Sequence, residues 1–529
     1  ELYYEKLLRG KTGRLQIRRD AKQRPVIINT TDIKKAEKGA DLYLTIDSQV
    51  QYSAQAELDA AAEKYRAKAG SIIVMNPNNG AIYAMANYPS YDPNNMEGFG
   101  PESRKNRAVT DIYEPGSTFK IFPMSLYIRE FKDADSQKVF CGNGAYEFFG
   151  RTVHDHEKHG WLTFDEVIKY SSNIGMVNLG LKVPQEKLYR EFVNFGFGRP
   201  TRIDMPHEPS GILRHYKEWD NISLTSIPYG QEVAVTPIQM ARAYAVIANG
   251  GFLITPHIVE RAEKNGKVIY RAGKEKPVRV LGEKECERLS RMLVGVTDKD
   301  GSGKKAVITG YTVAGKTGTA QKHNEKGRGY AAGRYVASFV GYLPAEKPEI
   351  LTLVVLDEPK PFYYGSETAA PVFKQINTKA VAALRVMPEN TYYASVTGRV
   401  EQARIEMPDI TKKNFFEAKK ILNSLKIKYR QYGFGKTVIS QEPAAGSLVN
   451  EGPEAVVYLG DLTKDSEVRV YMPDVRGLPI RKAVEILSAM GIKAQCVGSG
   501  YAVGQDPKPG TAVEKDRKCV VNFEMKDAG

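Results

Sequence analysis

The chain contains 529 residues, of which 42% are hydrophobic and 26% charged, so we expect a globular protein of several domains rather than a disordered chain. Its formal net charge of +14 indicates anionic surroundings, which could be nucleic acid, membrane headgroups or an acidic wall polymer. The sequence carries no zinc-finger, helix-turn-helix or RNA-recognition signature and no run of eighteen apolar residues, which argues against nucleic-acid binding and against a membrane span within it.

The first part of the chain predicts a basic segment, a strand, a long helix and a hairpin. These are expected at residues 1–40, 41–46, 49–65 and 70–87. The hairpin is indicated by two short apolar runs that flank Asn79-Gly80, a strong turn signal. The basic segment begins abruptly, and we expect a further segment to precede it.

A candidate nucleophile follows in the stretch Glu114-Pro-Gly-Ser-Thr-Phe-Lys120. Apolar residues recur after it at spacings of three and four, which predicts a helix that begins near Ser117. Ser117 and Lys120 would share one face of this helix, so the lysine amine could serve as a base for the serine hydroxyl. Because Ser-x-x-Lys is common by chance, an exposed helical turn with a solvated lysine also explains the pattern when it stands alone.

Residues 127–250 are expected to be mostly helical. Thr163 and Glu166 form a capping-box pattern, which predicts a helix over residues 165–170. This helix delivers Ser171-Ser172-Asn173 at its end, so a second pair of polar side chains would be held in a fixed place.

From residue 309 the spacing of apolar residues changes from that typical of helices to that typical of strands. Three strands and two flanking helices are expected at residues 312–321, 336–343, 350–356, 237–249 and 370–384. The first of these strands carries Lys316-Thr317-Gly318. Together the elements predict an α+β sheet domain that is interrupted by an all-α lobe, and active sites favour such seams.

The C-terminal part of the chain is an internal repeat. Met407-Pro-Asp-Ile410 recurs 65 positions later as Met472-Pro-Asp-Val475, and Gln441 recurs 64 positions later as Gln505. Each copy predicts one amphipathic helix followed by short strands. Units of this size are marginally stable alone and suit a binding module.

A nucleotide-binding motif competes for the lysine strand. Gly310 to Thr317 spells G-x-x-x-x-G-K-T, and Asp357-Glu358 follows a later strand as a possible partner. A phosphate loop must open a helix, whereas Lys316 is followed by Gly318 and by residues 322–327, which predict a loop. We therefore do not expect nucleotide binding.

Metal sites are also considered. His154, His156 and His159 form H-x-H-x-x-H in a polar loop, but no fourth ligand is marked, so we expect no metal and no cofactor. The four cysteines lack metal spacing as well. Cys496 and Cys519 lie in two strand-like runs of one small unit, where a disulfide is possible.

Three separated groups now form a specific set: Ser117-x-x-Lys120, Ser171-Ser-Asn173 and Lys316-Thr-Gly318. In their order and intervals the chain resembles the acyl-serine transferases, and among them the class B penicillin-binding proteins of cell division or sporulation. The middle group has a serine where the general pattern has an aspartate. Tyr229-Gly-Gln231 agrees with the family, the repeats are similar to PASTA modules, and the resemblance covers roughly residues 40–526.

The resemblance implies a penicillin-binding transpeptidase fold, an antiparallel sheet flanked by helices with an all-α lobe, followed by two small PASTA modules. Ser117 would be the acylated nucleophile, and Lys120 would be its base once burial and the charge of Lys316 lower its pKa. Ser171 would pass the proton to the leaving amine. Asn173 would orient Lys120 and hold the substrate amide.

The resemblance also implies a substrate site on the lysine strand. Lys316 and the hydroxyls of Thr317 and Thr319 would hold a carboxylate, and Gly318 would let the strand approach the substrate backbone. The N–H groups of Ser117 and Thr319 would form an oxyanion hole. The aromatic pair Tyr363-Tyr364 would be a substrate wall or an ordinary exposed loop.

The implied substrates are peptidoglycan stem peptides that end in D-alanyl-D-alanine, with a neighbouring amine as acceptor and β-lactam antibiotics as further ligands. The product would be cross-linked septal or spore wall. The catalytic domain is expected outside the cytoplasm, on a single-pass membrane helix absent from this sequence. Because residues 1–40 are too few for a glycosyltransferase domain, a separate membrane glycosyltransferase is expected as partner.

The chain divides accordingly into four parts. These are a pedestal remnant, a transpeptidase domain and two PASTA domains, at residues 1–40, 41–390, 391–462 and 463–529. A β-lactamase shares the acylation groups but needs a further group to activate water, and we find no second signature of the class A type. A scaffold that binds wall fragments without catalysis is disfavoured because every catalytic position is occupied.

Overall fold

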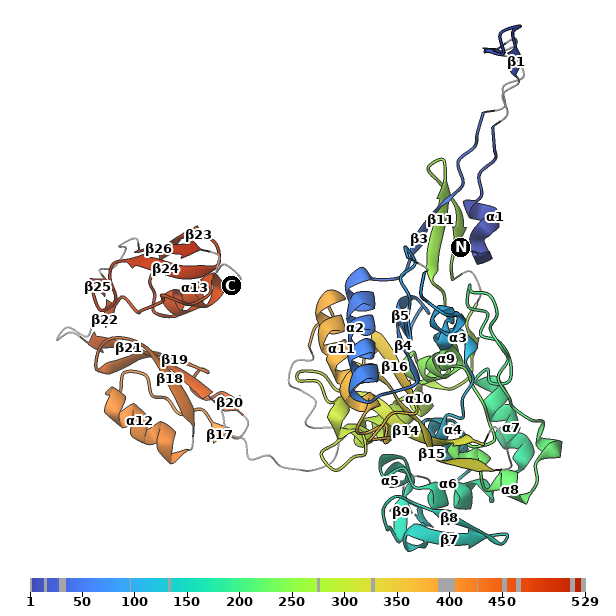
Figure 1. The fold of residues 1–529 in the computed structure, drawn as a ribbon. Coiled ribbons are helices and arrows are strands. Elements are labelled where there is room, and N and C mark those ends of the chain that lie inside the picture. Colours follow the sequence, from blue (N-terminus) through green and yellow to red (C-terminus); the bar gives the residue numbers. More distant parts are fainter. Residues whose placement is uncertain are drawn as a thin grey trace. The chain divides into compact units, whose positions relative to one another are not determined.

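The chain forms two units, Glu1–Thr397 and Gly398–Gly529, in the computed structural model shown in Figure 1. The structure describes residues 2–13, 17–27, 35–95, 97–131, 134, 136–273, 276–324, 329–388, 405–425, 427–449, 454–462, 468–513 and 519–524. Across these ranges, none of the helices combines the length and the apolar character that crossing a membrane requires.

The first unit is built on a five-stranded antiparallel sheet in the order β14-β15-β16-β4-β5. Its strands are β4 (Ala69–Met75), β5 (Ile82–Tyr88), β14 (Ala314–His323), β15 (Tyr330–Leu343) and β16 (Ile350–Asp357). The hairpin and the three later strands match the sequence prediction. The predicted loop after the lysine strand is wrong at its start, because Lys322 and His323 continue β14 and His323 pairs with Tyr330.

Helices cover both faces of this sheet (Figure 1). One face packs against α2 (Ser48–Lys64) and α11 (Ala369–Ala383), and the other against α4 (Ile121–Glu130), α9 (Pro237–Ala248) and α10 (Glu283–Thr297). Because strand residues alternate between faces, Ile72 belongs to the first core and its neighbour Ile73 to the second. The sheet is therefore buried on both sides, as its continuous apolar runs predict.

The lobe inserted between β5 and β14 is less helical than predicted. It contains α5 (Phe164–Lys169), α6 (Asn173–Gly180), α7 (Gln185–Asn194) and α8 (Asn221–Leu224), together with the strands β6 (Lys138–Phe140), β7 (Ala145–Phe148), β8 (Arg151–His154) and β9 (Trp161–Thr163). The strand pairs β6–β9 and β7–β8 form where Gly142, Gly144 and Gly150 take positive φ angles in tight turns. The predicted capping box of Thr163 and Glu166 is present at α5.

The remaining elements of this unit lie at its N-terminal end and around the lobe. They are α1 (Glu5–Leu8), α3 (Arg107–Thr110), β1 (Ile17–Arg19), β2 (Pro25–Ile27), β3 (Asp41–Leu44), β10 (Phe252–Leu253), β11 (Val259–Lys264), β12 (Lys267–Arg271) and β13 (Val278–Arg279). A small sheet in the order β12-β11-β3 connects β3, near the start of the chain, with β11 and β12, which follow the lobe in the sequence. The hydroxyl of Tyr4, the residue before α1, donates to Asp204 over 2.8 Å. This hydrogen bond holds the start of the chain against the segment that contains Asp204.

The second unit contains the two repeats, and the predicted helix followed by strands is present in each. The first has β17 (Ile405–Glu406), α12 (Phe415–Ser424), β18 (Lys428–Gly433), β19 (Thr437–Glu442), β20 (Leu448–Val449) and β21 (Glu454–Leu462), and the second has β22 (Val468–Tyr471), α13 (Ile480–Ala489), β23 (Ala494–Gly498), β24 (Tyr501–Asp506), β25 (Ala512–Val513) and β26 (Cys519–Glu524). β22 pairs with β21, so a sheet runs from one repeat into the next. No disulfide joins Cys496 to Cys519, because Cys519 lies opposite Ala494 in the register of β23 and β26.

Candidate active site

Ser117 lies in a tight turn of 3-10 helix, Gly116–Lys120, that runs directly into α4. The predicted helix is thus present, with a first turn that is wound more tightly than an α-helix. Gly116 has a φ of +55° and donates its N–H to the carbonyl of Gly230 over 3.0 Å. A side chain on Gly230 would lie 2.2 Å from the carbonyl oxygen of Gly116, so only glycine lets this support approach the nucleophile loop.

The turn that carries Ser171 and Asn173 is held by a carboxylate. Asp155 accepts hydrogen bonds from the hydroxyl of Ser172 and the N–H of Asn173, both over 2.5 Å, and from the N–H of Ile174 over 3.0 Å. These N–H groups are the unpaired donors at the start of α6, where a negative charge is favoured. The Nδ2 of Asn173 donates to the carbonyl of His154 over 2.8 Å, which fixes its side chain at the same loop.

Two lysine amines converge on the hydroxyl of Ser171. The Nζ of Lys120 lies 3.2 Å from Ser171 Oγ and 2.5 Å from the Ser171 carbonyl oxygen. The Nζ of Lys316 lies 2.9 Å from the same Oγ. Ser171 therefore links the 3-10 turn that carries Ser117 to the lysine strand β14.

Burial changes the protonation of both amines. Lys120 and Lys316 have no exposed surface. Burial lowers the pKa of Lys120 to about 7, against the negative charge of Asp155, which raises it. Burial and the neighbouring Lys120 lower the pKa of Lys316 well below its ordinary value. Because two buried like charges repel, we conclude that one of the two amines is neutral near pH 7 and can accept a proton.

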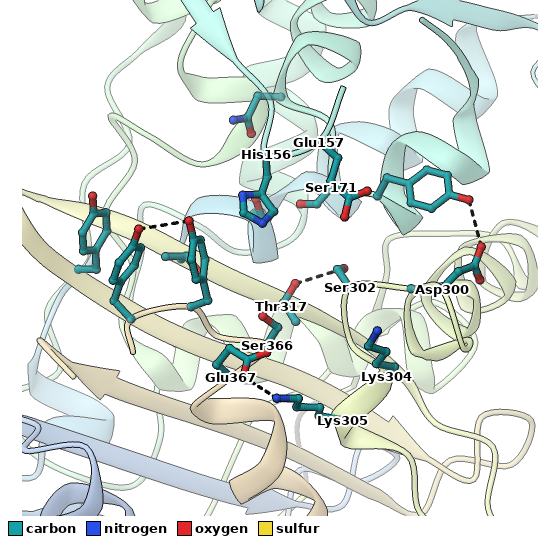
Figure 2. A pocket seen from close by; sticks show the side chains of 18 residues that line it. His156, Glu157, Ser171, Asp300, Ser302, Lys304, Lys305, Thr317, Ser366 and Glu367 are labelled. Atoms are coloured by element: carbon teal, nitrogen blue, oxygen red, sulfur yellow. Dashed lines mark hydrogen bonds and ion pairs between the residues drawn. The ribbon is translucent and has the colours of Figure 1, made fainter. Parts of the chain in front are cut away.

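These groups border a cleft of about 420 Å³. Figure 2 shows His156, Glu157 and Ser171 on one wall and Thr317, Ser366 and Glu367 on the opposite wall. The residues that line it are Ser117, His156, Glu157, Tyr170, Ser171, Asn173, Asp300, Gly301, Ser302, Lys304, Lys305, Thr317, Thr319, Tyr335, Tyr363, Tyr364, Ser366 and Glu367. The half-buried Ser117 is thus open to a ligand, while Lys120 lies behind it.

Hydroxyl groups of β14 face the cleft, and its lysine does not. Thr317 and Thr319 line the cleft, and the hydroxyls of Thr317 and Ser302 lie 3.4 Å apart. Thr319 Oγ1 accepts from the N–H of Gly365 over 3.0 Å. Lys316 is fully buried behind them, so its amine would carry a charge below the cleft surface only in its protonated form.

Gly318 is required by packing within the protein. A side chain there would lie 2.4 Å from Ser338 Oγ, 2.9 Å from a methyl carbon of Thr118 and 3.1 Å from the Pro115 carbonyl oxygen. The nucleophile loop therefore rests directly on β14, which is a physical reason for the glycine besides the substrate contact expected from the sequence.

An aromatic wall closes one side of the cleft. Tyr363 stacks on Tyr335 with ring centroids 4.3 Å apart and contacts Tyr364 at 4.4 Å. The ring of His156 packs against Tyr364 at 4.9 Å. Of the two alternatives for Tyr363-Tyr364, the structure favours a cleft wall over an isolated exposed loop.

All three predicted groups meet in one place. Ser117, Ser171, Asn173, Thr317 and Thr319 line the cleft, whereas Lys120, Lys316 and Gly318 lie directly behind its surface. In the described part of the chain, Lys120 forms no hydrogen bond to Ser117 and donates to Ser171 instead. Lys316 and Thr317 lie within β14, so the phosphate-loop alternative fails because no helix follows the motif.

Asp155 and Ser302 are site residues that no sequence motif indicated. Asp155 lies in the polar loop between His154 and His156, where no periodicity or motif distinguishes it from a solvated residue. The histidines do not converge, because His156 packs on Tyr364 and His159 stacks on Tyr170. No metal-binding group of histidine, cysteine or acidic side chains occurs among the residues that the structure describes.

Known proteins share these features. Residues 70–378 match the family described as Penicillin binding protein transpeptidase domain, and residues 405–460 and 470–523 match PASTA domain. The chain is 32% identical over 465 residues to Stage V sporulation protein D of Bacillus subtilis, which covers 87% of the chain and 71% of that protein. It is 34% identical over 393 residues to the probable peptidoglycan D,D-transpeptidase PbpC of Pseudomonas aeruginosa, which covers 74% of the chain and 67% of that protein.

A solved structure agrees with the fold. The transpeptidase domain of Burkholderia pseudomallei penicillin-binding protein 3 superposes with a TM-score of 0.57 at 32% identity, over 66% of the chain and 98% of that domain.

Proposed function

The chain belongs to the penicillin-binding protein transpeptidase family, and from this membership and the cleft we propose that it is a class B peptidoglycan D,D-transpeptidase whose acyl-enzyme forms on Ser117. The observation that carries the assignment of roles is the convergence of Lys120 and Lys316 on Ser171 Oγ beside the open Ser117. Its substrates are stem peptides that end in D-alanyl-D-alanine, and β-lactams bind as mimics of that end.

Acylation needs a base and a proton relay. We assign the neutral amine of Lys120 as the base that takes the Ser117 proton when Oγ attacks the carbonyl of the penultimate D-alanine. The proton then passes from Lys120 through the Ser171 hydroxyl to the nitrogen of the terminal D-alanine, which leaves as the peptide bond breaks. In the second half, the acceptor amine attacks the ester and its proton returns by the same route.

Binding is assigned to both walls of the cleft. The terminal carboxylate is held by the hydroxyls of Thr317 and Thr319, with the charge of Lys316 behind them when that amine is protonated. Asn173 holds the substrate amide, and its own side chain is oriented by the His154 carbonyl. The N–H groups of Ser117 and Thr319 stabilise the oxyanion, a role typically worth about 3 kcal/mol per donor.

The decisive experiment is intact-mass spectrometry after incubation with a labelled penicillin, followed by peptide mapping of the adduct. We expect one penicilloyl group on Ser117 that decays over minutes to hours, none on Ser117→Ala, and unchanged labelling of Ser53→Ala, a matched serine change on α2. An adduct elsewhere, or turnover within seconds as in a β-lactamase, would overturn the assignment.

We further propose that the protein acts outside the cytoplasm, anchored in the membrane and paired with a membrane glycosyltransferase, in septal or spore wall synthesis. The net charge of +14 supports work near anionic lipid and wall polymer, and the Bacillus relative is named for sporulation. The transpeptidase domain is assigned to residues 41–390, preceded by pedestal residues 1–40, and the PASTA domains to 391–462 and 463–529. Limited proteolysis with mass spectrometry of the fragments tests these boundaries.

A further inference from the structure

We propose that a row of aromatic rings beside the cleft, formed by Trp161, Phe140 and Tyr146 and named here the aromatic platform, binds the glycan strand to which the stem peptides are attached. The inference rests on the proposed transpeptidase function, because only then does a glycan accompany the peptide. It names a second part of the substrate, bound away from the reacting bond.

The rings form a continuous row that is anchored at one end. Phe140 and Trp161 are opposite each other in the β6–β9 pair, with ring centroids 5.3 Å apart. Tyr146 lies 6.1 Å from Phe140 and 4.9 Å from Phe148, and Phe148 is buried with residues of α6. Trp161 is 63% exposed and Tyr146 40% exposed, so the two ends of the platform present ring surface to solvent.

The aromatic platform is continuous with the wall of the cleft. β8 ends at His154, and the next two residues are Asp155, which holds the Ser171 turn, and His156, which lines the cleft. Hydrogen bonds from Asp155 N to Gly144 O over 3.0 Å and from Cys141 N to Gly160 O over 2.6 Å extend the β7–β8 and β6–β9 pairs, and Asn143, in the turn between β6 and β7, donates its N–H to His159 O over 2.9 Å. Figure 1 shows β7, β8 and β9 together beside α5 and α6. The platform therefore adjoins the cleft wall directly through β8 and the loop that follows it.

Strand β9, which carries Trp161, is also connected to the cleft wall. Trp161 opens β9 two residues after His159, whose ring stacks on the cleft residue Tyr170 with centroids 4.6 Å apart. A stem of five residues spans at most roughly 17 Å when extended. A stem whose D-alanyl end lies at Ser117 must therefore place its sugar near the mouth of this same cleft.

The chemistry of the platform fits a sugar chain. A pyranose ring presents a face of C–H groups that packs on an exposed aromatic face, and successive rings of a β-linked glycan repeat at a spacing similar to that between these centroids. The rings of Trp161 and Phe140 have no ionisable group, as suits an uncharged sugar backbone. Exposed apolar rings grouped in this way mark binding surfaces in soluble proteins.

The test uses the full chain and a β-linked N-acetylglucosamine oligosaccharide, a glycan backbone that carries neither stem peptide nor carboxylate. The chain has two tryptophans, and Trp219 is 8% exposed, so a change in fluorescence on titration reports chiefly on Trp161. We expect a saturable change in the unaltered chain. Because both Trp161 variants lose the reporting ring, their binding is measured by isothermal titration calorimetry, in which Trp161→Ala should abolish binding and Trp161→Phe should shift the affinity by no more than a few fold. The control is Tyr52→Ala, which removes an exposed ring on α2 and leaves the titration unchanged.

A kinetic test separates this inference from the proposed function. With a glycan-linked stem substrate, Trp161→Ala should raise the KM for D-alanine release about tenfold, while acylation of Ser117 by penicillin is unchanged. Equal losses on the glycan-linked and penicillin substrates would indicate a structural role and overturn the inference. A fluorescence response to anionic vesicles or to a protein partner, with none to the oligosaccharide, would overturn it as well.

Discussion

The Nζ of Lys316 lies 2.9 Å from Ser171 Oγ, an oxygen that is also 3.2 Å from the Nζ of Lys120. Two amines that would both be charged in water thus share one hydroxyl, and neither lysine has exposed surface. Desolvation and mutual repulsion disfavour the doubly protonated state, which is the condition that the proposed base needs beside the proposed nucleophile, Ser117. Holding these groups together is unfavourable by itself, so the packing of the rest of the domain must stabilise the site.

The first prediction concerns pH. Because burial lowers the pKa of Lys120 to about 7 and the neutral amine is the base, penicillin acylation should rise with pH up to about 7 and then level off. Below pH 7 the rate should fall about tenfold per pH unit. Lys120→Arg, which cannot lose its proton, should be at least about 10²-fold slower at every pH.

The matched control for that measurement is Lys322→Arg. Lys322 is the same residue type on β14, but it is ion-paired with Asp357 over 2.8 Å, away from Ser171. Its acylation profile should follow that of the wild type. A wild-type rate that stays flat from pH 5 to pH 9 would contradict the assignment of Lys120 as the base.

Asp155 is predicted to position the Ser171 turn and to tune Lys120. Its negative charge raises the pKa of Lys120, so Asp155→Asn should move the midpoint of the acylation profile below 7. Loss of its hydrogen bonds to the start of α6 should also lower the plateau rate about tenfold. Stopped-flow acylation across pH measures both effects, and a slower rate with an unmoved midpoint would assign Asp155 a structural role alone.

The sequence predicted the framework because the framework obeys local rules. The Asn79-Gly80 turn, the capping box of Thr163 and Glu166, and the apolar strands all appear where their patterns predict them. The three separated motifs were also sufficient to name the residues that the fold brings together, since each motif is continuous in the chain.

The parts that escaped prediction depend on contacts between distant segments. Asp155 becomes a site residue only when α6 begins beside it, and Lys120 donates to Ser171 only once the fold brings the two segments together. The strands β6 to β9 are too short for their period to be distinguished from that of a helix. The strand character of Lys322 and His323 follows from pairing with β15, which no local signal announces.

Gly318→Ala is predicted to impair acylation without unfolding the domain. The added carbon would lie 2.4 Å from Ser338 Oγ and 2.9 Å from Thr118, so the nucleophile loop must move away from β14. A displacement of this size typically costs about 10²-fold in rate. Adding Ser338→Ala should restore part of the lost acylation rate, because it removes the closest contact of the added carbon.

Gly100→Ala is the matched control for the glycine change. Gly100 has no atom within 4 Å of the added carbon and no positive φ, so acylation should be unchanged. If Gly318→Ala acylates as fast as Gly100→Ala, the close packing of the loop on β14 is not what aligns Ser117.

An ion pair between the buried Glu191 and the partly exposed Arg129 is predicted to fix α4. Glu191 on α7 is buried and accepts from the hydroxyl of Ser125 over 2.5 Å and from Arg129, both on α4. Arg129→Met leaves this carboxylate without its cation and should cost about 3 kcal/mol of unfolding free energy at pH 7. Urea unfolding followed by the fluorescence of Trp219, which packs near Phe192 of α7, measures it.

The loss of unfolding free energy in Arg129→Met should depend on pH, and its direction follows from Glu191. Burial raises the pKa of Glu191 in the folded protein, and Arg129 opposes the rise. Without Arg129 the folded state favours the protonated acid, so stability is lost as pH rises and the deficit should shrink below pH 5. Arg190→Met, which breaks an exposed pair with Glu186, should change stability by less than about 0.5 kcal/mol.

The last prediction is that the two repeats unfold as one unit. Tyr458 belongs to β21 of the first repeat but packs in the core that contains Ile486 and Leu487 of α13 in the second. A side chain on Gly433 of the first repeat would lie 2.5 Å from Met490 of the second, so the two copies are in close contact. Tyr458→Ala should therefore speed amide exchange in α13 as much as in β19, measured by hydrogen-exchange mass spectrometry of the full chain. Phe416→Ala, which removes an exposed ring on α12, is the control and should leave α13 unchanged. Faster exchange confined to the first repeat would show that the continuous sheet does not couple the two folds.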